Sequence, residues 1–294
     1  MGIPDPLTQR MKLSNGETIP SIHLGTYLTR DRETYQAVLD ALEVGYRAFD
    51  SAQLYENERE VGAAINSWLR RESFTDDSLR NGCSERKRSD IHYTTKLAEN
   101  SDYDKTMQSI RDSVQACGLG YIDLFLLHSP YGGPSARGES WRAVEDAMLE
   151  GLVKSGGVSN FGVRHLKELL QSKIRFKPSV NQIEIHPFNT RSEIVNFCRD
   201  QGIQIQAYSP LVHGLRMNHS TIISLSNTYS CTPSQLLIRW SVQHGYIALP
   251  KTTKKNRMIE NVDISGFKIS DEDMAVLDAL DEGLATDWDP TDAP

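Results

Sequence analysis

Three apolar runs in this chain each end on an ionisable side chain. The runs RAFD, IHYTTK and YIDLFLLH end on Asp50, Lys96 and His128. An apolar run that stops on such a group is typical of a buried strand whose far end opens into a site. Since segments with helical spacing separate the three runs, parallel strands would bring the three residues to one mouth. The pattern predicts a functional site at one end of a barrel.

Strand-like and helix-like segments alternate through the rest of the chain. The expected strands cover residues 21–25, 46–49, 91–95, 121–127, 152–158, 179–183, 203–207 and 246–249. Eight strands separated by helices favour a (β/α)8 TIM barrel over an open doubly wound sheet. No GxGxxG follows any of these strands, which also disfavours a Rossmann domain. Asn15-Gly16, between two short β-prone runs, predicts an N-terminal β-hairpin that closes the barrel floor.

The length of 294 residues suits one barrel domain over residues 1–294. Within it, residues 75–89 have no apolar period and are expected to form a flexible insertion on the face away from the chemistry. Residues 283–294 form an acidic C-terminal tail that contains Trp288. The loops at 131–137 and 212–218 are short, and their brevity predicts an open pocket.

Composition narrows the function classes. A net charge of −7 argues against a general nucleic-acid binder. No apolar run approaches the roughly 20 residues that cross a bilayer, and the opening MGIPDPLTQR has no secretory apolar stretch. The four cysteines form neither a CxxC pair nor a His/Cys metal spacing. We therefore expect a cytoplasmic protein with reduced thiols and without a metal, membrane or nucleic-acid partner.

One basic segment departs from this acidic balance. KTTKKNR carries Lys251, Lys254, Lys255 and Arg257 and no acidic residue. It could be the solvated start of a helix. It could also bind an anion such as phosphate. The residues alone leave both interpretations open.

The residues at the strand ends suit proton transfer. Tyr55 follows Asp50 by five residues, and a tyrosine that titrates near pH ~10 is too weak an acid for efficient catalysis near neutrality. Lys96 is expected to lower that pKa, while Asp50 keeps Lys96 charged. His128 could orient a substrate oxygen. Alone, each residue could be structural; together, at successive strand ends, they predict an active site.

Seven blocks along the chain resemble, in order, the signature blocks of the aldo-keto reductases. They are FDSAQLYENEREVG, TTKL, YIDLFLLHSP, GVSNFG, NQIEIHPF, AYSPL and LPKTTKKNRMIEN. The resemblance implies a (β/α)8 barrel that transfers a hydride between NADPH and a small-molecule carbonyl substrate. It also implies a catalytic tetrad of Asp50, Tyr55, Lys96 and His128, with Tyr55 as the proton donor.

The same resemblance implies a binding site for NADPH/NADP. Its residues would be Gly25, Thr26, Ser159, Asn160, Gln182, Tyr208, Ser209, Leu211, Lys251, Thr252, Arg257, Glu260 and Asn261. By resemblance, Tyr208 would stack on the nicotinamide, whose carboxamide Ser159, Asn160 and Gln182 would hold. Ser209 and Leu211 would lie along the pyrophosphate, and Glu260 and Asn261 would contact the adenine. Lys251, Thr252 and Arg257 match the positions that grip the 2′-phosphate. The charge of the basic segment independently favours NADPH over NADH.

Two departures from the family pattern bear on the substrate. Ala98 stands where many relatives have an aromatic residue, and Ser129 stands where many have Trp. We assign both, with Tyr27, to the substrate pocket. The lost bulk predicts a wider mouth that accepts larger carbonyls than small aldoses.

The leading prediction is a monomeric NADPH-dependent oxidoreductase that reduces an aldehyde or ketone to an alcohol. The alternative is an NADPH-binding regulatory subunit of the same fold with little turnover, like the aldo-keto-reductase-fold subunits of potassium channels. A metal-dependent barrel hydrolase ranks last, because His128 and His186 are too few and lack carboxylates placed to help.

Overall fold

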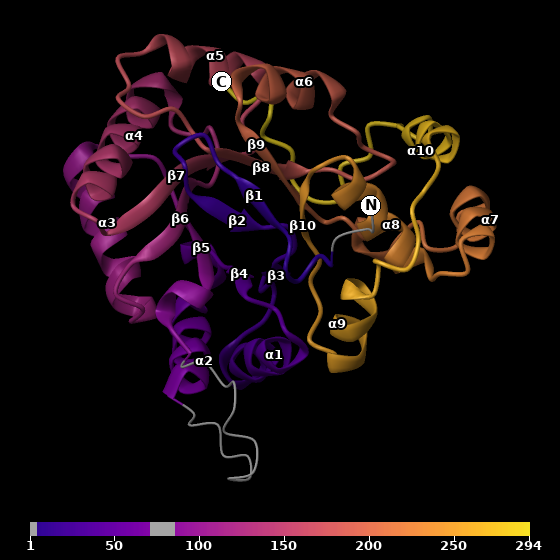
Figure 1. The fold of residues 1–294 in the computed structure, drawn as a ribbon. Coiled ribbons are helices and arrows are strands. Elements are labelled where there is room, and N and C mark those ends of the chain that lie inside the picture. The colour runs from indigo at the N-terminus through magenta and orange to yellow at the C-terminus, as the bar shows by residue number, and fades with distance from the viewer. Residues whose placement is uncertain (1–4, 71–85) are drawn as a thin grey trace.

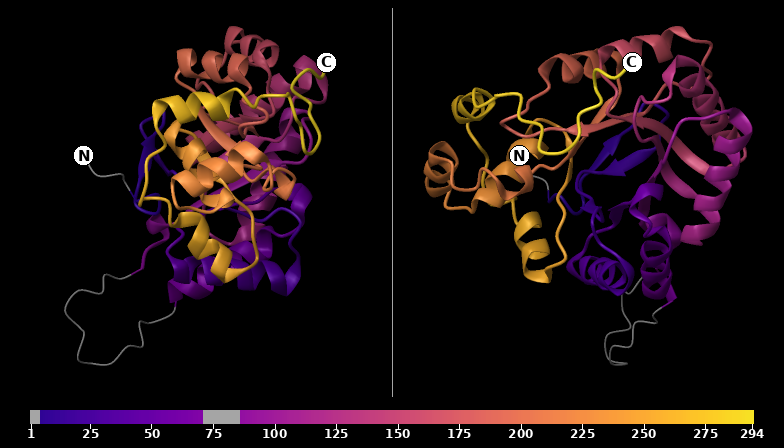
Figure 2. Two further views of the ribbon diagram at one scale, coloured as in Figure 1. Left: turned by 90° about the vertical axis from the view of Figure 1, so that its right-hand side faces the viewer. Right: turned by 180° about the vertical axis from the view of Figure 1, so that it is seen from behind.

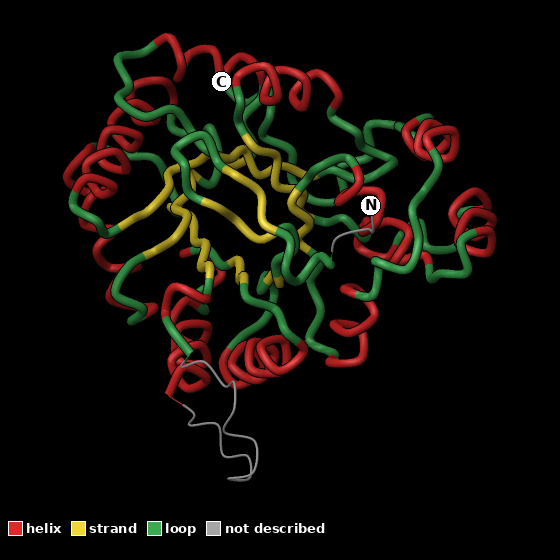
Figure 3. Tube along the Cα trace, in the orientation of Figure 1, coloured by secondary structure: helices red, strands yellow, loops and turns green. Residues whose placement is uncertain are grey.

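The structure is a computed structural model that describes residues 5–70 and 86–294. Its centre is a sheet of eight parallel strands, ringed by helices (Figures 1 and 3). The strands are β3 (Leu24–Gly25), β4 (Ala48–Asp50), β5 (His92–Leu97), β6 (Ile122–Leu127), β7 (Val153–Ser159), β8 (Val180–Glu184), β9 (Gln204–Tyr208) and β10 (Ile247–Leu249). Each pairs with its neighbour in chain order. The backbone N–H of His23 donates to the carbonyl of Ala248 at 3.0 Å and joins the first strand to the last. The predicted (β/α)8 fold is therefore confirmed.

Amphipathic helices cover the outside of the barrel. They are α1 (Asp31–Val44), α2 (Glu58–Arg70), α3 (Tyr103–Cys117), α4 (Gly133–Leu149), α5 (Val163–Gln171), α6 (Ser192–Gln201), α7 (Ser220–Thr228), α8 (Pro233–Gln243), α9 (Lys255–Val262) and α10 (Asp271–Asp278). Short 3-10 turns are η1 (Gln53–Tyr55), η3 (Arg88–Asp90) and η4 (Val212–Gly214). On α2, Val61, Ile65 and Trp68 are buried, as their helical spacing predicts. None of the described helices is long and apolar enough to span a membrane.

The predicted N-terminal hairpin is present and covers one end of the barrel (Figure 1). Its strands β1 (Arg10–Lys12) and β2 (Thr18–Pro20) pair antiparallel. Gly16 in the turn has a φ of 92°, a conformation that glycine adopts without strain. Leu13 and Ile19 pack with Leu124 and Ile247 inside the barrel, so the hairpin closes the floor with apolar side chains.

The glycine pair on β7 has a packing role. A Cβ atom on Gly156 would lie 2.8 Å from Cγ1 of Val144 on α4. A Cβ atom on Gly157 would lie 2.6 Å from Cδ2 of Leu126 on β6. The absence of side chains therefore lets a helix outside the strand and a leucine inside the barrel approach its backbone closely.

Two further segments were singled out in the sequence, the expected insertion and the C-terminal tail. Most of the expected insertion, residues 75–85, lies outside the described residues. At its end, the Arg88 guanidinium donates to Oδ2 of Asp123 at 2.6 Å and to three backbone carbonyls. The C-terminal tail, yellow in Figure 2, runs from α10 toward α5 and α6. Along this path the tail contributes side chains to the cleft at the mouth of the barrel.

Candidate active site

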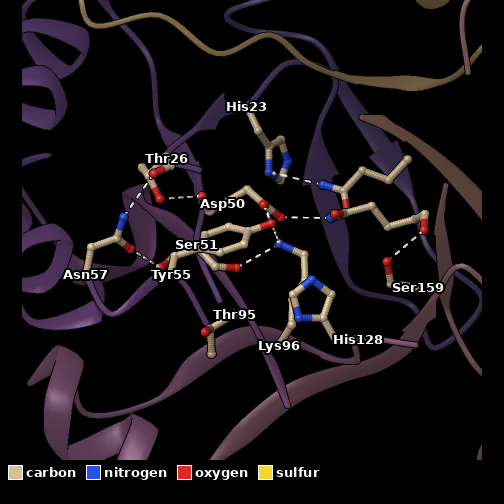
Figure 4. A network of polar contacts seen from close by, with 12 residues as sticks. His23, Thr26, Asp50, Ser51, Tyr55, Asn57, Thr95, Lys96, His128 and Ser159 are labelled. Atoms are coloured by element: carbon tan, nitrogen blue, oxygen red, sulfur yellow. Dashed lines mark hydrogen bonds and ion pairs between the residues drawn. The ribbon is translucent and has the colours of Figure 1, made fainter. Parts of the chain in front are cut away.

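The end of β5 carries a buried lysine whose ammonium is fully hydrogen-bonded. Lys96 Nζ lies 2.5 Å from Oδ1 of Asp50, 2.8 Å from the carbonyl oxygen of Ser51 and 3.3 Å from Oη of Tyr55 (Figure 4). An ammonium has three protons to donate, and these three acceptors use all of them. β4 supplies Asp50 and η1 supplies Tyr55, so strand ends far apart in sequence meet at one point.

Burial and pairing act in opposite directions on this ion pair. Burial raises the pKa of Asp50 and lowers the pKa of Lys96, while their mutual attraction opposes both shifts. The other oxygen of Asp50 accepts a hydrogen bond from Nε2 of Gln182 at 2.8 Å. With every proton of Lys96 and both oxygens of Asp50 engaged, the geometry is that of a charged pair.

The pKa of Tyr55 moves opposite to the sequence-based expectation. Burial, followed by the negative charge of Asp50, raises it well above the usual value. The ammonium of Lys96 lies 3.3 Å from the phenol oxygen, but Asp50 lies closer to that ammonium and offsets its charge, so the net shift of the Tyr55 pKa is upward. Tyr55 is therefore fully protonated near neutral pH, which suits a proton donor.

His128 faces the tyrosine as a neutral imidazole. Its ring lies edge-on to that of Tyr55, with centroids 5.8 Å apart. Burial, with a smaller effect from the charge of Lys96, lowers the pKa of His128 to about 3. A neutral imidazole carries one N–H and can donate a single hydrogen bond to a substrate oxygen.

A polar column continues from the ion pair into the barrel. Nε2 of Gln182 also donates to Oε1 of Gln206 at 2.9 Å, and Nε2 of Gln206 lies 3.3 Å from Nδ1 of His23 (Figure 4). The His23 ring packs edge-on against that of His92, 5.2 Å away. This column fixes the orientation of Asp50 from below, and nothing in the sequence pattern revealed it.

Sequence reasoning also missed Gln53, which lies in the same 3-10 turn as Tyr55. Its Oε1 accepts the backbone N–H of Ala98 at 2.7 Å. Its Nε2 donates to the hydroxyls of Ser109 and Ser113 on α3, at 2.8 and 2.9 Å. Gln53 thus ties the turn that carries Tyr55 to the strand that carries Lys96. Its position between Asp50 and Tyr55 is the only sequence signal for this role.

A cleft of about 1010 Å³ opens above these residues. The predicted site residues that line it are Gly25, Tyr27, Asp50, Tyr55, His128, Ser159, Asn160, Gln182, Tyr208, Ser209, Leu211, Lys251, Thr252, Arg257, Glu260 and Asn261. Lys96 lies beneath it, fully buried. Thr26 is also buried beside the cleft, where its hydroxyl donates to the Asp50 carbonyl at 2.8 Å.

Polar side chains in the middle of the cleft hold one another in place. The Tyr208 hydroxyl donates to Oδ1 of Asn160 at 2.9 Å, and Nδ2 of Asn160 donates to the His128 carbonyl at 3.1 Å. Ser159 donates to the Gln182 carbonyl at 2.9 Å. Asn160 and Ser209 have φ angles of 60° and 49°, a strained conformation for side-chain-bearing residues that often marks functional sites.

The far end of the cleft is basic. Lys251 and Arg257 line it, and among the described residues neither forms an ion pair within 4.0 Å. Lys255, in the same segment, instead pairs with Glu43 on α1 at 2.6 Å. The segment therefore divides into cations that line the cleft and at least one that pairs with a helix outside it.

The C-terminal tail contributes an aromatic ring to the mouth of the cleft. The Trp288 ring lies 6.0 Å from that of His128 and 5.6 Å from that of Tyr131, and Trp288 lines the cleft. Ala98 and Ser129 are not among the residues that line the cleft, and their assignment to the substrate pocket stays a prediction. The tail thus adds an aromatic ring to the cleft wall beside His128, and Gln53 binds the backbone of Ala98.

No group of three or more metal-ligand side chains occurs within residues 5–70 and 86–294. His186 does have a carboxylate neighbour, contrary to expectation, because Oε1 of Glu184 lies 3.0 Å from its Nε2. That carboxylate also binds the tail. Cys117, Cys198 and Cys231 form no disulfide, and Cys83 lies outside the described residues.

Comparisons with known proteins agree with this architecture. A sequence model of the Aldo/keto reductase family matches residues 21–282. An uncharacterized oxidoreductase of Schizosaccharomyces pombe is 44% identical over 284 residues, which are 97% of this chain and 98% of the relative. Glyoxal reductase of Bacillus subtilis is 35% identical over 282 residues, 95% of each chain. The solved structure of Bombyx mori aldo-keto reductase in complex with NADP aligns with a TM-score of 0.83 at 31% identity and 95% coverage of both chains.

The parallel barrel with a tyrosine and a buried lysine–carboxylate pair at its mouth is the architecture of a barrel oxidoreductase. The chain belongs to the aldo/keto reductase family, as its sequence blocks indicated.

Proposed function

We propose that this protein is an NADPH-dependent oxidoreductase that reduces an aldehyde or ketone to an alcohol, with Tyr55 as the proton donor. One observation carries the proposal. The fully bonded ammonium of Lys96 lies 3.3 Å from the Tyr55 hydroxyl, directly under a cleft that His128 also lines. A protonated phenol, a fixed positive charge and a neutral imidazole therefore converge on one space.

When bound, NADPH would supply a hydride to the carbonyl carbon, so negative charge would develop on the carbonyl oxygen. Tyr55, held protonated by its raised pKa, gives its proton to that oxygen. Lys96 then stabilises the phenolate that remains, because its ammonium is already in place and needs no rearrangement. His128 donates a hydrogen bond to the same oxygen and orients the substrate.

The side chains of the cleft fit this cofactor. Lys251 and Arg257 offer unpaired positive charge for the 2′-phosphate, with Thr252 between them in the cleft wall. Tyr208, fixed by its bond to Asn160, offers a ring against which the nicotinamide would stack. Ser159, Asn160 and Gln182 would hold the carboxamide, and Glu260 and Asn261 the adenine. Gly25, Ser209 and Leu211 would line the chain between them. The NADP complex of the Bombyx mori relative supports this choice of cofactor.

The test is NADPH oxidation with a panel of aldehydes and ketones, compared between wild type and Tyr55→Phe. We expect the substitution to lower kcat by about a hundred- to ten-thousandfold while leaving NADPH binding intact. Tyr121→Phe is a matched control, because Tyr121 lies below β6 and packs its ring under Arg88. Equal activity of Tyr55→Phe and wild type would rule out Tyr55 as the proton donor.

The same measurement distinguishes the proposed enzyme from the alternative, a regulatory subunit with little turnover. Tight NADPH binding without turnover of any carbonyl would favour the regulatory subunit. The monomeric state and cytoplasmic location stay predictions, and sedimentation of the purified protein would test the first.

A further inference from the structure

The tip of the C-terminal tail, which we define as Asp287 and Trp288, is anchored on both sides by hydrogen bonds and an ion pair. Before the tip, the backbone N–H of Thr286 donates to Oε1 of Glu184 at 2.9 Å, and its hydroxyl donates to the same oxygen. After the tip, Oδ2 of Asp289 pairs with the guanidinium of Arg191 at 2.5 Å. Asp287 and Trp288, between these anchors, line the cleft. The two side chains are therefore a built part of the wall.

Asp287 brings a negative charge close to the reacting groups. Burial raises the pKa of Tyr27, Tyr55 and Tyr208, and the charge of Asp287 contributes to all three increases. Its Oδ1 accepts the backbone N–H of Trp288 at 3.0 Å. Within the described part of the chain, no cation lies within ion-pair distance of Asp287.

Several other charged groups near Tyr55 have hydrogen-bond or ion-pair partners. Lys96 pairs with Asp50, Asp289 pairs with Arg191, and buried Glu184 is held by His186 and Thr286. The unpaired cations Lys251 and Arg257 belong to the basic end of the cleft. A carbonyl substrate at Tyr55 thus meets in the cleft wall the negative charge of Asp287, which no cation within ion-pair distance among the described residues balances.

We propose that Asp287 is a specificity-determining residue that selects against anionic carbonyl substrates and directs the enzyme to neutral and cationic aldehydes and ketones. The inference rests on the proposed carbonyl reduction and names its substrate class. Since Asp287 is exposed to solvent, salt screens its field, and we expect the discrimination to be about three- to tenfold.

Three para-substituted benzaldehydes test the charge alone. 4-Nitrobenzaldehyde is neutral, 4-formylbenzoate has nearly the same shape and is an anion, and 4-(trimethylammonio)benzaldehyde is a cation. We expect Asp287→Asn to raise kcat/KM for the anion about three- to tenfold, to lower it for the cation and to change it less than twofold for the neutral substrate. High salt should shrink both charged effects. Comparing variant with wild type for each substrate cancels the electronic differences between the rings.

Asp292→Asn is the matched control. Asp292 lies in the same tail and is exposed, but it faces a depression beside α5 and α6 instead of the cleft. Its substitution should leave all three rates unchanged. Equal changes for the three substrates in Asp287→Asn, or the same pattern in Asp292→Asn, would overturn the inference.

Failure of the proposed function has a different signature. If the wild type reduces none of the aldehydes, the carbonyl-reductase proposal fails. Binding of 4-formylbenzoate and 4-nitrobenzaldehyde to wild type and Asp287→Asn, measured by equilibrium dialysis, then decides the charge selection. A ratio of Kd values that Asp287→Asn leaves unchanged would contradict it, and a ratio shifted in favour of the anion would support it.

Discussion

Gln53 accepts the backbone N–H of Ala98 through its side-chain oxygen at 2.7 Å. Ala98 follows Lys96 by two residues, and Gln53 precedes Tyr55 by two. The bond therefore fixes the distance between the proposed proton donor and the ammonium beneath it. Gln53 is a positioning residue, because its side chain acts through the backbone of other residues.

Gln53→Leu should lower kcat about ten- to a hundredfold, because small displacements of reacting groups are costly. The KM for NADPH should stay within twofold, since Gln53 does not line the cleft. The free energy of unfolding should fall by about 1–2 kcal/mol with the lost hydrogen bonds. Gln108→Leu on α3, whose amide bonds only exposed Asp112 among the described side chains, is the control. A variant with reduced stability but unchanged kcat would show a purely structural role.

A second prediction concerns the cations Lys251 and Arg257 at the basic end of the cleft. Lys251→Ala and Arg257→Ala should each raise the KM for NADPH about tenfold and leave the KM for NADH nearly unchanged, because only NADPH carries the 2′-phosphate. Lys255→Ala removes an equal charge from the same segment, but one that pairs with Glu43. It should affect neither KM. Steady-state kinetics with both cofactors would show whether the three lysine and arginine variants differ in this way.

Buried neutral histidines make the fold sensitive to acid. Burial, then the charge of Arg10, lowers the pKa of His92 to about 3, and burial, then His92, lowers that of His23 well below its usual value. Below pH ~6.5 these histidines bind protons in the unfolded chain but stay neutral in the folded protein. The free energy of unfolding should therefore fall between pH ~6.5 and ~3, by about 1.4 kcal/mol per pH unit for each such histidine.

Urea unfolding at several pH values measures this dependence. His92→Leu should flatten the slope by about one proton. The free energy of unfolding of the variant, relative to that of wild type, should therefore be higher at pH 5 than at pH 7. A slope that the substitution leaves intact would show that other groups cause the acid sensitivity.

The anchor of the tail can be weakened without removing a side chain from the cleft. Thr286→Val keeps the backbone bond to Glu184 and removes the hydroxyl bond. We expect the carbonyl KM to rise about two- to fivefold, because Trp288 and Asp287 lose part of their support. Thr228→Val on α7, where the hydroxyl bonds a carbonyl of its own helix, serves for comparison. An unchanged KM would mean that the Asp289 anchor suffices.

The sequence revealed the parts of this molecule that repeat or match a pattern. Period and turn residues gave the eight strands and the hairpin, and apolar runs ending on Asp50, Lys96 and His128 located the mouth. Contacts that depend on a side chain's final direction left no such signal. Gln182 on β8, Gln206 on β9 and His23 just before β3 meet inside the barrel, so their column could not be read from spacing.

The sequence also missed one aromatic residue of the cleft wall, for a related reason. Ala98 and Ser129 follow the proposed catalytic residues Lys96 and His128 in sequence, but neither is among the residues that line the cleft. The ring that does, Trp288, comes from a tail without regular structure, and its place depends on Glu184 and Arg191. The pKa of Tyr55 was mispredicted because the paired charge of Asp50 and the extent of burial are properties of the assembled fold.

Side chains from the helices around the barrel also bind residues 292–294 of the tail. Guanidinium groups of Arg164 and Arg137 donate to the carbonyls of Asp292 and Pro294, at 3.3 and 3.1 Å. An affinity tag or reporter fused after residue 294 would pull on a segment that also sets the position of Trp288 and Asp287. Substrate preferences measured on such a fusion would then describe the fusion, and a cleavable tag becomes a requirement for any enzymology on this protein.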